Sequence, residues 1–190
     1  MWKPTPEPRR SFCLETERMW ITACSEFEPR AYADTLVRNR LHIDRYMPDE
    51  ILNLGTGEVD AFLDSLGAAW DAGDALCFVA IDKSSMAFRT QIYVQPIDRP
   101  ADIVEIGYFA DVDSQGHGFV TEAVGCVSRF LFERTAARKI CLICDVDNRA
   151  SIGVAERCGY VLEGTLRAHA LNKDGTRPDR RFYARLPDDP

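Results

Sequence analysis

Residues 105–123 constrain the fold of this 190-residue chain more than any other stretch. An apolar run ending at Ala110 predicts a strand, Gly116 and Gly118 predict a tight loop, and the apolar pattern from Phe119 onward predicts a long helix. Two glycines at a sharp turn let consecutive N–H groups converge on one small space, and the helix adds the positive end of its dipole. Such a unit is typical of an anion cradle, most often for phosphate. The alternative is a plain tight connection between strand and helix.

The order of the predicted elements places this cradle in a mixed sheet. The chain reads as a strand, helices, antiparallel strands, and then strand–helix–strand–helix–strands. This order predicts an α+β architecture with helices on both faces of the sheet. Residues 1–15 are Pro-rich and charged, so we expect a mobile arm there. A single domain follows over residues 16–190.

Charge and cysteine content bear on the class of partner. With 23 Lys and Arg against 30 Asp and Glu, the net charge of −7 disfavours nucleic acid as a partner. No apolar run approaches the roughly 20 residues that cross a membrane, and the first ten residues lack the apolar core of a secretory signal. The seven cysteines lie mainly in apolar patterns, which favours reduced core residues of a cytoplasmic protein. Cys141 and Cys144 point to opposite faces of a strand, so we predict no metal site.

The loop residues Gln115–Val120 resemble the Gln/Arg-x-x-Gly-x-Gly/Ala pyrophosphate loop of the GNAT superfamily of acetyl-CoA-dependent N-acetyltransferases. Val120 departs from that pattern, which has Gly or Ala there, so the last amide of the cradle is more crowded. Further segments resemble the RimJ/RimL-like branch of ribosomal-protein N-terminal acetyltransferases in order and spacing. They are Glu105–Tyr108, Thr121–Val124, Asp147–Ser151, Cys158–Tyr160 and Glu163–Arg167. The resemblance covers roughly residues 16–187.

The resemblance implies a fold and a cosubstrate. The fold is a GNAT-like mixed, mainly antiparallel seven-stranded sheet, in which the strands at 103–110 and 140–146 splay apart. Acetyl-CoA is the implied cosubstrate: its pantetheine arm enters the gap between the splayed strands, and its pyrophosphate lies in the cradle. The implied cofactor-binding residues are Phe109, Ala110, Gln115, Gly116, His117, Gly118, Phe119, Val120 and Asn148.

Two residues are candidates for catalysis. Glu105 lies in an apolar strand on the same face as Gly107, which suits a general base; the alternative is an edge glutamate paired with an arginine. Many GNAT enzymes use a tyrosine to protonate the departing thiolate, but Ala155 occupies that position here. The RimJ/RimL-like branch carries Asn-x-x-Ser, and by resemblance Ser151 is the candidate acid. The alternative is that Asn148 and Ser151 only cap a helix.

The leading hypothesis for function is direct transfer of an acetyl group from acetyl-CoA to a primary amine. At pH 7, deprotonating an α-amine costs about 1 kcal/mol, against about 4–5 kcal/mol for a lysine side chain. This difference favours the N-terminal amine of a protein or peptide, as the resemblance also implies. Two alternatives stay open: a small-molecule amine of aminoglycoside or polyamine type, and a catalytically silent acyl-CoA-binding module. The sequence leaves the oligomeric state open, a homodimer included.

Overall fold

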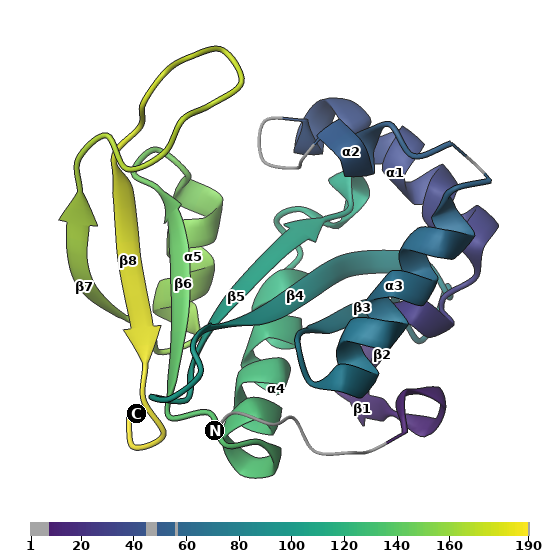
Figure 1. The fold of residues 1–190 in the computed structure, drawn as a ribbon, viewed down its shortest axis with the longest axis horizontal. Helices are drawn as coiled ribbons and strands as arrows, with labels where there is room; N and C mark the ends of the chain where they lie inside the picture. Colours follow the sequence, from purple (N-terminus) through teal and green to yellow (C-terminus); the bar gives the residue numbers. More distant parts are fainter. Residues whose placement is uncertain (1–7, 45–48, 56, 190) are drawn as a thin grey trace.

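A computed structural model describes residues 8–44, 49–55 and 57–189 of the chain. One eight-stranded sheet runs through the molecule in the order β1-β2-β3-β4-β5-β6-β8-β7 (Figure 1). Its strands are β1 (Cys13–Glu15), β2 (Met19–Ala23), β3 (Leu76–Asp82), β4 (Phe88–Asp98), β5 (Ile103–Ala110), β6 (Lys139–Asp145), β7 (Val161–Leu166) and β8 (Arg180–Arg185).

Helices cover both faces of this sheet (Figure 1). The α-helices are α1 (Pro29–Ile43), α2 (Asp49–Leu52), α3 (Val59–Ala72), α4 (Phe119–Arg134) and α5 (Arg149–Arg157). Short 3-10 turns are η1 (Arg9–Ser11), η2 (Cys24–Glu26) and η3 (Val112–Ser114). Strand alternation divides the core into two layers, as β3 illustrates: Phe78 packs with Leu131 of α4, whereas Val79 packs with Leu36 of α1 and Leu63 of α3.

The pairing between β5 and β6 stops early, and this defines the centre of the molecule. These neighbours are the sheet's parallel pair, and they are joined only at Ile103↔Lys139, Val104↔Ile140 and Glu105↔Cys141. Beyond that point β5 remains paired with β4 as far as Ala110, and β6 remains paired with β8 as far as Asp145. The two halves of the sheet therefore diverge as a wedge (Figure 1). The predicted mixed α+β fold with two splayed central strands is confirmed.

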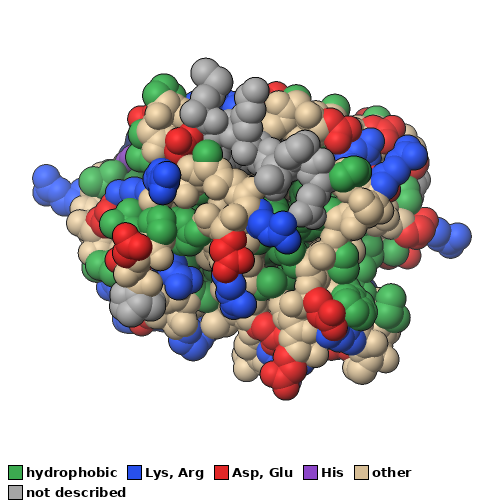
Figure 2. Space-filling view, turned by 90° about the horizontal axis from the view of Figure 1, so that it is seen from below, with side chains coloured by type: hydrophobic (Ala, Val, Ile, Leu, Met, Phe, Trp, Pro, Cys, Tyr) green, Lys and Arg blue, Asp and Glu red, His purple; other side chains and the backbone are tan. Residues whose placement is uncertain are grey.

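The surface carries both signs of charge. Figure 2 shows one face, on which Lys and Arg side chains alternate with Asp and Glu and no broad field of one sign forms. No helix in the described ranges has the length and hydropathy to cross a membrane. The seven cysteines are unpaired, and the described residues contain no group of three or more His, Cys, Asp or Glu side chains placed to hold a metal ion.

The start of the chain differs from the expectation. Residues 1–7 of the predicted mobile arm lie outside the described residues, but residues 8–15 form η1 and β1 and belong to the fold. Phe12 is only 3% exposed, and its ring centroid lies 5.0 Å from that of Trp70 and 5.1 Å from that of Phe130. Because β1 pairs with β2, the sheet has eight strands where seven were predicted.

This packing predicts that Phe12 stabilises the whole domain. Phe12→Ala should lower the free energy of unfolding by about 3–5 kcal/mol, because it leaves a cavity among three other aromatic rings. The matched control is Val37→Ala on α1, where the side chain is 76% exposed and the change should stay within about 0.5 kcal/mol. Urea unfolding measures both. Equal midpoints for the two variants would show that residues 8–15 are not part of the cooperative unit.

Candidate active site

The predicted cradle lies between the end of β5 and the start of α4. Gly116 and Gly118 have φ values of +74° and +78°, a region that side-chain-bearing residues rarely adopt. Gly118 is the residue before the first helical turn, and no side chain caps α4. The first amides of α4 therefore point out of the helix end without a side-chain acceptor. A β-carbon at Gly116 would meet no atom within 4 Å, so open space adjoins the loop.

Val120 and Phe119 contribute to this cradle through their amides. The side chain of Val120 is half-buried and packs against the core beneath α4. Phe119 is buried in the same core, and the guanidinium groups of Arg18 and Arg89 lie 4.3 and 4.6 Å from its ring centroid. The aromatic ring is thus enclosed by protein, and only the backbone of Phe119 remains for a ligand.

Arg18, which lies near the start of the chain, clamps the loop through hydrogen bonds. It follows β1, and its Nε donates to Oε2 of Glu122 at 2.6 Å while its backbone N–H donates to Oε1 at 3.0 Å. Its Nη1 donates to the carbonyl of His117 at 2.9 Å. Burial alone would raise the pKa of Glu122, but the hydrogen bonds from Thr16 and Arg18 outweigh it, and the net shift is downward. One side chain therefore holds both the loop and the first turn of α4.

A second anchor joins the segment before the loop to α1. Asp111 is 2% exposed and accepts hydrogen bonds from Nε of Arg38 at 3.1 Å and from Nδ2 of Asn39 at 3.0 Å. Oδ1 of Asn39 in turn accepts from the backbone N–H of Val112 at 2.7 Å. Burial alone would raise the pKa of Asp111, but the bonds from Asn39 and Arg38 lower it overall.

Gln115, predicted to lie in the cradle, also contacts α1. Its Nε2 is 2.8 Å from Nε2 and 3.2 Å from Nδ1 of His42. His117 is exposed and holds the loop through its carbonyl. The Gln115 side chain is thus directed to α1, and the backbone amides of the loop are the groups that a ligand there would meet.

The register of β5 decides which backbone groups face the wedge. Asp111 donates its N–H to the carbonyl of Arg89 next to β4, and backbone groups on a strand alternate between its two edges. Phe109 therefore faces β4, and its carbonyl accepts a bond from Thr90 Oγ1 at 2.7 Å. This corrects the expectation that Phe109 offers backbone groups to a ligand in the gap. The backbone of Ala110 faces the wedge in this register, and so does that of Tyr108.

Glu105 lies at the point where the wedge begins. It forms the last Cα pair with β6 and shares the α1–α3 face with Gly107 and Phe109. Its Oε2 is 3.5 Å from Nε2 of Gln95, and no ion pair to an arginine is found for it among the described residues. Gly107 is exposed, and a β-carbon there would meet nothing within 4 Å. The carboxylate of Glu105 thus borders open space on this face.

Asn148 and Ser151 lie on the other side of the wedge, at the start of α5. Oδ1 of Asn148 accepts the N–H of Ser151 at 3.1 Å, so Asn148 is the helix cap. The hydroxyl of Ser151 is not needed for that cap. It lies near the hydroxyl of Tyr108, whose pKa it lowers against the larger effect of burial.

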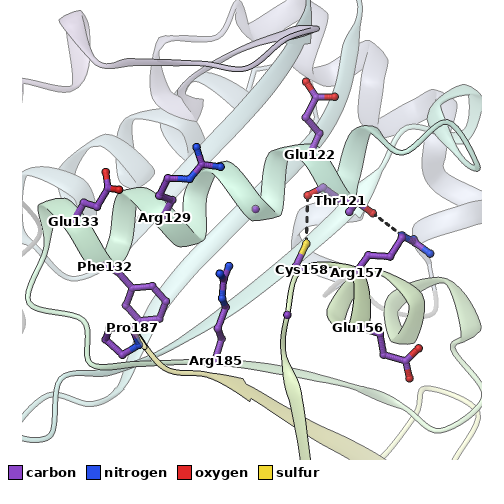
Figure 3. Close-up of a pocket in the computed structure, with 12 residues that line it drawn as sticks. Thr121, Glu122, Arg129, Phe132, Glu133, Glu156, Arg157, Cys158, Arg185 and Pro187 are labelled. Atoms are coloured by element: carbon purple, nitrogen blue, oxygen red, sulfur yellow. Dashed lines mark hydrogen bonds between the residues drawn. The ribbon is translucent and has the colours of Figure 1, made fainter. Parts of the chain in front are cut away.

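A hollow of about 630 Å³ adjoins the first turn of α4 on its outer side. Arg185 extends into it from the end of β8 toward α4, and Arg157 and Cys158 bond to Thr121 across its upper end (Figure 3). The charged lining is balanced between three arginines and three glutamates, so it offers no excess of positive charge and we assign it no separate anion site. These residues are Arg129, Arg157, Arg185, Glu122, Glu133 and Glu156.

Comparison with known proteins agrees with this geometry. Residues 19–161 match the acetyltransferase (GNAT) domain family. The chain belongs to this family. Over 95 residues it is 33% identical to the ribosomal-protein-serine acetyltransferase of Escherichia coli (strain K12), covering 50% of this chain and 51% of that protein. The chain thus spans about half the length of the curated relatives it matches.

Solved structures of GNAT proteins share the fold. RimL, a ribosomal L7/L12 alpha-N-protein acetyltransferase solved with coenzyme A, superimposes with a TM-score of 0.83 at 19% identity, covering 92% of this chain and 98% of the other. The ribosomal-protein-S5-alanine acetyltransferase from Vibrio fischeri gives 0.82 at 21% identity, covering 94% and 98%. The family predicted from residues 105–167 is confirmed. The roles of individual site residues remain predictions.

Asp111 should make the stability of this GNAT domain depend on pH. Because its folded pKa lies below its unfolded value, the ionised carboxylate stabilises the fold at neutral pH, and this contribution is lost as the pH falls below about 4. Asp111→Asn should cost about 1–3 kcal/mol at pH 7, since buried donors lose a charged acceptor. The difference from wild type should shrink on acidification.

Urea unfolding between neutral and acid pH measures this effect. The matched control is Asp113→Asn, which makes the same charge change at an exposed position two residues away and should leave the pH profile unchanged. If the free energies of unfolding of wild type and Asp111→Asn differed by the same amount at all pH values, the assignment of this pH dependence to Asp111 would be contradicted.

Proposed function

We propose that this GNAT domain transfers an acetyl group directly from acetyl-CoA to a primary amine, most favourably the N-terminal α-amine of a protein or peptide. The observation that carries the proposal is the open edge between β5 and β6, which leads from Glu105 to the uncapped start of α4. A chain-like cosubstrate with a pyrophosphate at one end and a thioester at the other fits these two features together.

The protein's donor groups match acetyl-CoA. Gly116 to Val120 lie at the positive end of α4, where two phosphates would be held by backbone N–H groups and the helix dipole. Ala110 would bond the pantetheine arm through backbone groups that β6 leaves unpaired, and would thereby place an N–H near the thioester oxygen. The amide of Asn148 would bond the same arm from the side of α5.

Glu105 is proposed as the general base. It would take a proton from the incoming ammonium group, directly or through a water molecule, so that the neutral amine can attack the thioester carbon. Backbone N–H groups in the wedge would stabilise the oxyanion, and Ser151 would assist departure of the thiolate. The acetyl group would pass directly between the substrates, because burial raises the pKa of the Cys141, Cys144 and Cys158 thiols and so disfavours the thiolate that acyl-cysteine chemistry needs.

The proposed acceptor is supported by amine chemistry and by the name of a relative, and the proposed compartment by the cysteines. A single carboxylate of moderate strength deprotonates an α-amine far more easily than a lysine. The name of the E. coli relative, a ribosomal-protein-serine acetyltransferase, supports a protein N-terminus as acceptor. Seven unpaired cysteines fit a reducing compartment such as the cytoplasm.

The test is thiol release from acetyl-CoA in the presence of peptides with free N-termini, small amines, or no amine. Peptide-dependent release is expected, and Glu105→Gln should lower kcat/KM about 100-fold because it removes the base. Glu163→Gln, which alters an exposed ion pair with Lys139, is the matched control and should match wild type. Binding of the coenzyme without thiol release for any amine would indicate a catalytically silent acyl-CoA-binding module instead.

The clamp at Arg18 makes a separate prediction about binding. Arg18→Ala should raise the Kd for CoA about tenfold, or about 1.4 kcal/mol, because the loop loses its anchor. Arg10→Ala removes the same charge from an exposed position and should leave Kd unchanged. Isothermal titration calorimetry measures both.

Glu122→Gln separates anchoring from direct contact with phosphate. It weakens the clamp while leaving the Arg18 cation in place, so it should also raise Kd. If only Arg18→Ala weakens binding, Arg18 contacts the ligand itself and the clamp is not the reason.

A further inference from the structure

Tyr108 carries a buried polar group that nothing in the fold explains. Its hydroxyl oxygen is shielded from solvent and makes no hydrogen bond of ordinary geometry with the described residues, although the Ser151 hydroxyl lies near enough to lower its pKa. A polar group left in this condition costs about 1–3 kcal/mol. A phenylalanine would fill the same space without that cost, so the hydroxyl has donor capacity that the described residues leave unused.

The position of Tyr108 points to what that partner is. The residue lies on β5 three positions beyond Glu105, the last residue paired with β6, so it belongs to the open edge of the wedge. Its ring packs against the core layer of α4 and α5. Ser151 of α5, Cys158 directly after α5, and Cys144 of β6 are close enough to influence its ionisation. The side chain therefore reaches across the wedge from one half of the sheet toward the other.

The wall of the wedge opposite Tyr108 is formed by α5. Ala155 of α5 is fully buried and carries no polar group. Tyr108 approaches the same region from the opposite wall, next to Ser151. Tyr160, which lies in the same core layer, is by contrast satisfied, because its hydroxyl is 2.8 Å from Oγ of Ser128.

We propose that Tyr108 donates a hydrogen bond to the sulfur of coenzyme A as the thiolate leaves. The proposal rests on the acetyl transfer proposed above. In the step it serves, the amine nitrogen forms a bond to the carbonyl carbon, the carbon–sulfur bond breaks, and its electron pair stays on sulfur. Glu105 has already taken the first proton from the ammonium group, and the second proton, which the nitrogen loses as the amide forms, passes to solvent water.

Tyr108 keeps its own proton in this step. Burial raises the pKa of Tyr108 well above its ordinary value, and a thiol of the coenzyme type ionises near 8.5. The hydroxyl therefore stays neutral beside the thiolate and stabilises it by hydrogen bonding. Ser151 is the second donor at the same sulfur.

The decisive variant is Tyr108→Phe, with Tyr160→Phe as its matched control. Tyr108→Phe should lower kcat about 10- to 100-fold with KM for acetyl-CoA unchanged. It should leave the urea midpoint equal to or above that of wild type, because it removes an unsatisfied group. Tyr160→Phe should do the reverse, lowering the midpoint and leaving kcat unchanged.

The thiol pKa of bound CoA is a readout that a purely structural role of Tyr108 would not change. Ultraviolet titration of the thiolate in the CoA complex should give a higher thiol pKa for Tyr108→Phe than for wild type. An unchanged thiol pKa, an unchanged kcat, or a clear loss of stability in Tyr108→Phe would each overturn the proposal. Failure of wild type to bind CoA would instead overturn the acetyl transfer on which it rests, so the two failures are distinguishable.

Discussion

The interrupted pairing of β5 and β6 is the constraint on which the rest of the structure depends. β5 and β6 are joined by three Cα pairs. Beyond these pairs they are no longer paired with each other, although β5 stays paired with β4 and β6 stays paired with β8. Unpaired backbone groups inside a protein are costly unless water or a ligand satisfies them. A sheet that keeps such an open edge at its centre is suited to receive an extended molecule as a substitute strand. The cradle lies at the open end of that edge, so one extended molecule could contact both.

Two anchors keep the cradle in place without occupying its amides. Arg18 holds the loop and α4 through Glu122 and the carbonyl of His117, while Asp111 ties the preceding segment to Arg38 and Asn39 of α1. Both anchors bond side chains or carbonyls, which leaves the first N–H groups of α4 for an anion. Because the loop is already fixed, binding does not have to order it, and this saves part of the entropic cost of association.

The sequence was informative where local chemistry decides the structure. Gly116 and Gly118 predict the loop because their positive φ values exclude most other residues, and the apolar pattern after Phe119 predicts α4. It was uninformative where distant contacts decide. Phe12 lies in a charged, Pro-rich segment, and its packing against Trp70 and Phe130, together with the pairing of β1 with β2, makes that segment part of the domain.

The same limit applies within the site. Nothing near Arg18 in the sequence indicates a partner 104 residues away, and the direction of the Phe109 backbone depends on the pairing register between β4 and β5. A shift of one residue in that register would exchange the edges that Phe109 and Ala110 face. Sequence patterns fix which residues form a strand more firmly than they fix that register.

Strand alternation finally separates the two halves of the proposed chemistry. Glu105 and Gly107 lie on the α1–α3 face of β5, whereas Tyr108 lies on the α4–α5 face with Ser151 across the wedge. The group that accepts a proton and the groups that would stabilise a thiolate are thus on opposite sides of one sheet. In the proposed reaction, a substrate that passes between β5 and β6 would meet both groups. The donor would enter from the side of α4 and α5, and the amine would approach from the side of α1–α3.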